Sequence, residues 1–310
     1  MVSVKEIENY KEYGKCVVIS NGEIEAYVTV DLGPRIIRFG FLGGKNVLFD
    51  NRKAFTPTTD KVYTDYYGEG KAWENFGGHR VWITKETYPE TYTPDDQPVK
   101  YTVTENGAVF EQPDDTKNGI KKIFEIKMDP DDANMQIKTT VKNISDKEKE
   151  FAVWCISVSA AGGTLIIPMN TNNTGYLANR TISVWSYTDL SDSRLNFGKK
   201  YVTVKQDTNA KTPLKIGFDL IAGQVYYVNG NDVFCKKYEN NHPDGVYPDN
   251  GVSFETYTNK VMIEIENLSE VKKVASGEEN TMVESWSLFK KPCEVDFADE
   301  NSVDEFLTKI

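Results

Sequence analysis

Alternation of apolar and polar residues recurs along most of this chain. In the segment 24–30 every second residue is apolar, and similar alternation occurs at 124–128, 135–142 and 261–266. Successive side chains of a strand point to opposite faces, so a period of two predicts strands that each bury one face. The chain is therefore predicted to consist mainly of antiparallel strands.

Turn signals and the other segments support this prediction. Asn-Gly pairs, the strongest short hairpin signal, occur at 21–22, 106–107, 118–119 and 229–230. The nearly continuous apolar run 151–158 predicts a central strand covered on both faces. Residues 302–310 are predicted to form a short helix capped by Asp299 or Ser302. Because no repeat and no linker divides the sequence, residues 1–310 are predicted to form a single domain, a large antiparallel β-sandwich with a short C-terminal helix.

Three segments, 51–71, 85–100 and 232–251, are rich in Tyr, Asp, Pro and Thr and are predicted to be long loops. Long loops in a compact β domain often carry function, because a sheet cannot by itself line a site. Aromatic residues make up 12% of the chain, a composition that suits β-structure and also suits surfaces on which ring faces stack against sugars.

Charge and cysteine spacing exclude several classes of function. The net charge of −11 argues against nucleic-acid and anionic-membrane partners. The four cysteines are far apart and form no C-x-x-C pair, so they predict neither a metal site nor a disulfide framework. No segment reaches transmembrane length, and the N-terminus is polar. This favours a cytoplasmic protein, although removal of a signal peptide would leave a similar N-terminus.

The tetrapeptide Gly77-Gly78-His79-Arg80 contains one of only two histidines. Imidazole titrates near neutral pH, glycines permit close approach of a ligand, and guanidinium is a forked donor for hydroxyl or carboxylate oxygens. This combination predicts a ligand-binding loop with acid/base capacity. The simpler interpretation is a Gly-Gly turn followed by a strand whose His and Arg are solvated.

A second candidate is Glu255, in the segment 251–259. If this segment is a strand, Glu255 shares a face with Ser253 and Tyr257, an arrangement suited to a general base or to an anchor for sugar hydroxyls. The simpler interpretation is an outward-facing glutamate on a solvated sheet.

Several short motifs resemble the galactose-mutarotase-like (aldose 1-epimerase-like) superfamily. They are the turn and strand carrying Arg35, the segment 44–48 (Gly-Lys-Asn-Val-Leu), the Gly-Gly-His-Arg element, the segment 140–145 before Phe151, and the strand with Glu255. Together they cover most of the chain. Trp82, Glu86, Tyr92 and the segment 264–268 are most similar to a bacterial branch distinct from the galactose mutarotases proper.

The resemblance implies roles for individual residues. In mutarotases of this superfamily a glutamate takes the proton from the anomeric hydroxyl while a histidine protonates the ring oxygen. Carried over, Glu255 would be the base, His79 a catalytic contact, and Arg80 or Arg35 would bind ring hydroxyls. Trp82 and Tyr92 would help to position the sugar, and no organic cofactor is implied.

One departure from the superfamily pattern limits this inference. The strand 154–159, where the acid histidine normally lies, contains none. Cysteine and serine have pKa values well above neutral, which makes them poor acids for a ring oxygen. Either His79 serves as the acid, His242 reaches the site from its loop, or the reaction is not mutarotation.

We therefore expect a carbohydrate-binding protein whose groove is rich in aromatic and acidic side chains, with aldose 1-epimerase-like (isomerase) activity if an acid faces Glu255. The alternative is a non-catalytic carbohydrate-binding protein that has lost this acid. The partner would be a small or oligomeric carbohydrate. Lys236 would meet an acidic or phosphorylated sugar unless it is an ordinary surface lysine.

Overall fold

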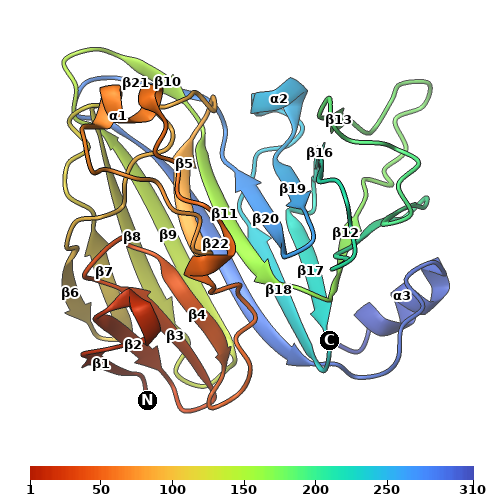
Figure 1. The fold of residues 1–310 in the computed structure, drawn as a ribbon. Coiled ribbons are helices and arrows are strands. Elements are labelled where there is room, and N and C mark those ends of the chain that lie inside the picture. The colour runs from red at the N-terminus through yellow and green to blue at the C-terminus, as the bar shows by residue number, and fades with distance from the viewer.

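The computed structural model describes all 310 residues and consists mainly of two stacked ten-stranded sheets (Figure 1). In spatial order, the first sheet contains β1 (Ser3–Ile7), β2 (Cys16–Ser20), β3 (Ile24–Thr29), β4 (Ile36–Phe41), β5 (Gly78–Ile83), β11 (Val153–Ala160), β20 (Met262–Leu268), β19 (Phe254–Thr258), β16 (Leu214–Phe218) and β13 (Ile182–Val184).

The second sheet faces the first across the main core. It contains β14 (Leu195–Phe197), β15 (Tyr201–Lys205), β12 (Thr164–Pro168), β17 (Gln224–Asn229), β18 (Asp232–Tyr238), β22 (Glu279–Lys290), β9 (Asn134–Asn143), β8 (Ile120–Met128), β7 (Gly107–Glu111) and β6 (Lys100–Thr104). Adjacent strands pair antiparallel throughout, as the alternation predicts; β8 with β9 and β19 with β20 are examples.

The remaining elements are short. A two-stranded sheet joins β10 (Lys149–Phe151) to β21 (Lys272–Val274). The helices are α1 (Lys61–Tyr67), α2 (Pro248–Gly251) and α3 (Glu300–Leu307), with 3-10 turns at Lys11–Tyr13 and Arg52–Ala54. Helix α3 lies beside the second sheet and buries Val303 and Phe306 against it (Figure 1). No helix has the length and apolar character that crossing a membrane would require.

Several sequence predictions are confirmed. The Asn-Gly pairs at 21–22, 106–107 and 229–230 each contribute at least one residue to the turn of the β2–β3, β6–β7 or β17–β18 hairpin. The apolar run 151–158 supplies β11, which lies between β5 and β20 and is buried along nearly its whole length. Asp299 caps α3 by accepting a hydrogen bond from the backbone N–H of Asn301.

The loop predictions need correction. Residues 232–238 form β18 rather than a loop, because the adjacent Lys236 and Lys237 hid the strand pattern that the pairing with β17 and β22 reveals. Residues 61–67 form α1, whose N-terminus Asp60 caps by accepting hydrogen bonds from two backbone N–H groups. The second of the predicted loop segments, 85–100, contains no helix or strand before Lys100.

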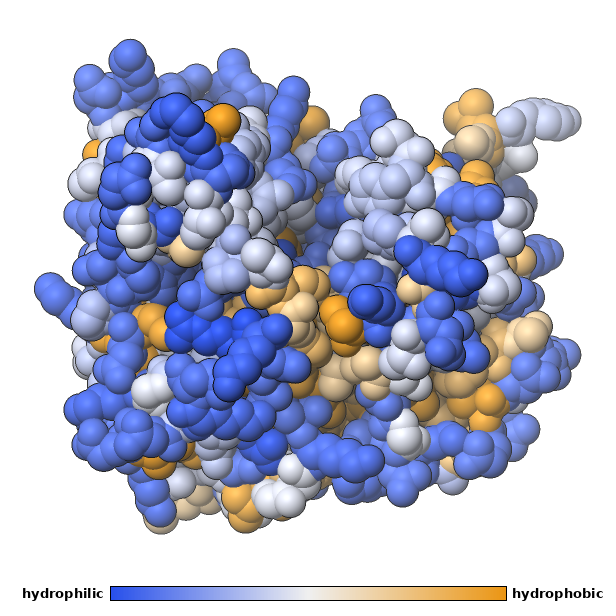
Figure 2. Space-filling view, in the orientation of Figure 1, coloured by the Kyte–Doolittle hydropathy of each residue, from blue (hydrophilic) through white to orange (hydrophobic).

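The first sheet is covered on both faces near its middle. Its inner face joins the main core of 44 buried residues between the sheets. A second apolar cluster, which includes Trp82, Trp154 and Met262, lies on the outer face of β5, β11 and β20. Hydrophobic side chains gather near the middle of the molecular face in Figure 2, between two hydrophilic blocks. A central sheet region covered on its outer side in this way can form the floor of a site.

Candidate functional site

The register of the first sheet sorts the predicted site residues onto opposite faces. Arg80 on β5 stands in the same row as Glu266 on β20 and Glu255 on β19. His79 stands in the next row, so its side chain points to the inner face. There its ring packs 5.0 Å from the ring of Trp286 in the second sheet. The structure therefore does not bring His79 and Glu255 to one cavity.

A hollow of about 370 Å³, here called the groove, opens on the outer face of the first sheet. Seven aromatic side chains line it: Phe55, Trp73, Trp82, Tyr92, Trp154, Tyr187 and Tyr257. Its polar lining consists of Thr56, Asn75, Arg80, Glu86, Lys215, Asn259 and Glu264. The groove thus combines ring faces with donors and acceptors placed between them.

Trp82 and Tyr92, both predicted from the sequence to position a ligand, pack together in one wall of the groove. The ring centroid of Tyr92 lies 5.0 Å from those of Trp73 and Trp82. The hydroxyl of Tyr92 donates a hydrogen bond to Glu86. Burial, followed by this carboxylate, raises the pKa of Tyr92. Packed rings of this kind form a rigid surface with little conformational entropy to lose when a ligand binds.

Arg80 enters the groove among these rings. Its guanidinium lies 4.5 Å from the ring centroid of Trp82 and donates a 3.0 Å hydrogen bond from Nη2 to Glu264. Only 4% of the residue is exposed, yet Nε and Nη1 have no hydrogen-bond partner. Buried guanidinium donors are normally satisfied, because an unmade bond to a charged group costs about 1.5–3 kcal/mol.

Glu255 lies behind the groove floor in a buried charge cluster. The ammonium of Lys215 lies 2.8 Å from Glu255 and 2.9 Å from Glu266, and the indole N–H of Trp154 donates to Glu266 at 2.8 Å. Burial raises the pKa of both glutamates, and Lys215 opposes this shift. Burial alone would lower the pKa of Lys215, but the two carboxylates raise it above its usual value. Lys215 therefore holds Glu255 by a direct ion pair.

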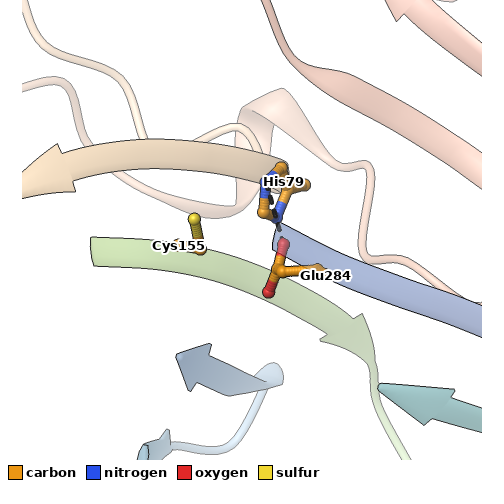
Figure 3. Close-up of side chains that lie close together, drawn as sticks. All are labelled: His79, Cys155 and Glu284. Atoms are coloured by element: carbon orange, nitrogen blue, oxygen red, sulfur yellow. Dashed lines mark ion pairs between the residues drawn. The ribbon is translucent and has the colours of Figure 1, made fainter. Parts of the chain in front are cut away.

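His79 belongs instead to a polar group between the sheets, here called the inter-sheet cluster: His79, Ser157, Lys236, Asn267 and Glu284. The ammonium of Lys236 donates to Ser157 and lies 2.8 Å from Glu284. The Ser157 hydroxyl and Nδ1 of His79 share a hydrogen bond of 2.9 Å. The imidazole Nε2 then faces Glu284 at 3.6 Å (Figure 3). Burial, followed by nearby cations, lowers the pKa of His79 well below its usual value, so the ring is neutral.

Lys236 is thus fully buried rather than available to a sugar at the surface. The inter-sheet cluster also contains the set of side chains that most resembles a metal site. Donor atoms of His79, Cys155 and Glu284 lie within 4.8 Å of one another (Figure 3). Lys236 already supplies Glu284 with the positive charge that a cation would bring, and burial raises the pKa of Cys155. We therefore assign this group a structural role.

Arg35 is also fully buried and lies outside the groove. It donates to Asp95 at 2.8 Å and to the carbonyl of Gly77, and its guanidinium lies over the ring of Phe76. Gly77 and Gly78 have positive φ angles, and a Cβ on them would lie 2.0 Å and 2.6 Å from backbone oxygens of neighbouring segments. The two glycines therefore serve backbone packing beside β5 rather than approach of a ligand.

His242, the other histidine considered as an acid, lies outside the groove. Its ring stacks on Tyr247 with the centroids 4.0 Å apart. Burial lowers its pKa. Neither histidine of the chain therefore lines the groove that contains Arg80.

Sequence reasoning missed several groove residues. Glu264 was noted only as part of the alternating segment 261–266; it is 7% exposed and lines the groove, and Glu266 on the same face of β20 is fully buried. Trp154 was assigned to a covered strand, and Lys215 and Trp73 were not singled out. The dense tryptophans were the available signal, since four of the five, at positions 73, 82, 154 and 185, lie in or beside the groove.

No protein-family model matches the chain, and no curated protein matches it in sequence. Solved structures share its fold. A candidate aldose 1-epimerase from Klebsiella pneumoniae superposes with a TM-score of 0.62 at 11% identity, over 100% of this chain and 87% of that chain. A galactose mutarotase-like protein from Lactobacillus casei gives 0.55 at 9% identity, over 88% and 100%.

A TPR-domain containing protein from Parabacteroides distasonis gives a TM-score of 0.56 at 11% identity, over 90% of this chain. The chain spans about half of that protein, 48% of its length. These likenesses confirm the galactose-mutarotase-like fold that the sequence motifs predicted.

Proposed function

We propose that the groove on the outer face of the first sheet binds a saccharide. The observation that carries this proposal is Arg80, a buried guanidinium with two unpaired donors set among tryptophan and tyrosine rings. Sugars present hydroxyl oxygens at their edges and apolar C–H groups on their ring faces. Nε and Nη1 are covered by neighbouring side chains in this structure, so such a ligand would satisfy them after a small side-chain movement, while one of its faces covers an aromatic ring.

The other groove residues fit the same kind of ligand. Asn259 and Asn75 offer both donors and acceptors, and Glu264 offers carboxylate oxygens next to Arg80. A volume of about 370 Å³ lies in the range of small-molecule pockets. The fold shared with aldose 1-epimerase-like proteins is consistent with a carbohydrate ligand and does not by itself define one.

Binding without catalysis is the form of this function that the geometry supports best. Mutarotation needs an acid and a base within hydrogen-bond reach of the ring oxygen and the anomeric hydroxyl. His79 points to the other face of the sheet, and Glu255 is 1% exposed and paired with Lys215. An isomerase that uses this groove would have to draw both functions from its carboxyl groups, its tyrosines and Lys215, without a histidine.

A binding assay with a matched arginine control tests the proposal. Hexoses, pentoses and uronic acids are titrated into wild type, Arg80→Met and Arg38→Met by calorimetry and ligand-observed NMR. Arg38 also pairs with a glutamate, Glu25, and lies over a tyrosine ring, but it is outside the groove. We expect Arg80→Met to weaken binding by about 10- to 100-fold, the contribution of charge-assisted hydrogen bonds, and Arg38→Met to bind normally. Equal binding by all three proteins, or no binding by wild type, would refute the proposal.

The catalytic alternative is tested on the same sugars. NMR follows the conversion of freshly dissolved α-anomers with wild type and Glu255→Gln. We expect no acceleration over buffer by either protein. An acceleration by wild type that Glu255→Gln abolishes would instead establish an isomerase in which Glu255 takes part.

A further inference from the structure

A larger hollow lies next to the groove and shares Trp82 with it as a wall. Its volume is about 880 Å³, and it lies between the end of β5, the segment that follows it, the start of β8, β10 and residues 246–249. Four lysines line it: Lys85, Lys117, Lys122 and Lys149. We call it the lysine hollow. The arrangement is unusual in a chain that has 47 acidic against 36 basic residues.

Lys122 is the distinctive member of this group. It lies on β8 and shares the inward face of this strand with Ile120 and Phe124, so only 6% of the residue is exposed. Its ammonium group forms no ion pair and no hydrogen bond, although it borders the hollow. Burial lowers the pKa of Lys122, and the carboxylates of Asp95 and Asp115, neither of which forms an ion pair with it, oppose this shift only in part.

The other buried lysines show what Lys122 lacks. Lys215 and Lys236 each have carboxylates at about 2.8 Å. Lys121, the neighbour of Lys122 on the opposite face of β8, pairs with Glu111 at 2.6 Å. A buried cation is normally paired, so an unpaired ammonium at a hollow indicates a position for an anion that comes from outside the chain.

The charged side chains that line the hollow indicate how much negative charge a ligand can carry. Three carboxylates, Glu90, Glu150 and Asp249, also line it, against four ammonium groups. A single negative charge would balance this excess, whereas a doubly charged group would exceed it. The ligand chemistry that fits best is a carboxylate.

We propose that the lysine hollow binds the carboxylate of an acidic saccharide, such as a uronate, through Lys122. The sugar ring or a neighbouring sugar unit then occupies the groove across Trp82. The assignment rests on the proposed saccharide function of the groove and adds the charge of the ligand to it.

The test compares matched pairs of sugars that differ at one group, glucose with glucuronate and galactose with galacturonate. Calorimetry measures their affinities for wild type, Lys122→Met and Lys121→Met. We expect at least one uronate to bind wild type about 10- to 100-fold more tightly than its neutral partner. Lys122→Met should bind the uronate no more tightly than the neutral sugar, with its affinity for the neutral sugar unchanged. Lys121→Met should bind both sugars as wild type does. Equal binding of acid and neutral sugars by wild type, or an unchanged advantage in Lys122→Met, overturns the assignment.

Two further measurements separate this assignment from the groove proposal. Sodium acetate is titrated while the indole NMR signals are followed; a shift that Lys122→Met removes supports the hollow even if no sugar binds. No such shift together with no sugar binding overturns both proposals. Glucose 6-phosphate is the second comparator, and a gain with this sugar but not with glucuronate would overturn the carboxylate assignment. Thermal unfolding of Lys122→Met checks folding, which replacement of a buried charge by an apolar side chain should preserve.

Discussion

Two buried charge clusters lie on opposite faces of the same sheet and differ in what completes them. In the inter-sheet cluster, Lys236 bonds to Glu284 and Ser157, and the unpaired atoms of His79 and Glu284 face each other, which leaves only Oδ1 of Asn267 without a partner. On the outer face, Arg80 bonds to Glu264 and leaves two donors free at a hollow. The chain itself supplies nearly all the partners of the first cluster, whereas the second retains two unpaired donors, which we propose a ligand completes.

The difference teaches that burial and charge alone do not mark a functional site. His79 has the residue type, the scarcity and the flanking glycines of a catalytic group, but it serves to tie the two sheets together. Its neighbour Arg80 has the unsatisfied donors. Free hydrogen-bonding capacity next to a cavity distinguishes the two residues better than residue type does.

The largest effect is expected from a substitution in the inter-sheet cluster. Lys236→Met leaves the carboxylate of Glu284 without its cation, and we expect a loss of about 3–5 kcal/mol in the free energy of unfolding. Urea denaturation measures this loss. The double variant Lys236→Met/Glu284→Gln should recover part of it, because the uncompensated charge is removed. A loss below about 1 kcal/mol would show that the cluster does not hold the sheets together.

A smaller effect is expected from the equivalent change on the outer face. Lys215→Met leaves Glu255 and Glu266 without their shared cation, but Lys215 lines the groove, so water can hydrate the two carboxyls there, whereas Lys236 is fully buried between the sheets. We expect a loss of about 1–3 kcal/mol by urea denaturation. A loss equal to that of Lys236→Met would mean that the two faces are equally closed.

The smallest effect is a difference in pH dependence. Folding lowers the pKa of His79. Below about pH 6.5 this imidazole therefore binds a proton in the unfolded chain but stays neutral in the folded protein. Stability from this group is therefore complete above that pH and decreases as the pH falls. His79→Gln should remove up to about 1.4 kcal/mol per pH unit from the slope between pH 6.5 and 5.

Denaturant titrations of wild type and His79→Gln at several pH values measure that slope. The glutamates with raised pKa values act in the opposite direction, since their stabilisation decreases as the pH rises above about 4.5, but they are common to both proteins. Parallel curves throughout would mean that the pKa of His79 is the same in the folded and unfolded states.

Local pattern was sufficient for much of the fold and for little of the site. Alternation, Asn-Gly turns and the apolar run of β11 depend on neighbouring residues, and the strands they predict are present. The pairing of Lys236 with Glu284 depends on how β18 aligns with β22, which no local pattern encodes. Trp82, Tyr92 and Arg80 were identified because they cluster in sequence, whereas Lys215 and Glu264 approach the groove only through the order of the strands.

The two glycines before β5 have a consequence that reaches beyond their own turn. A side chain on Gly77 would collide with the carbonyl oxygen of Phe49, so the chain can pass this point only in one position. That position sets the phase of the strand that follows, and with it the destination of every side chain in β5. A shift of one residue would place a guanidinium between the sheets and an imidazole in the groove. The glycine pair therefore determines that Arg80, and not His79, lies on the outer face of the first sheet.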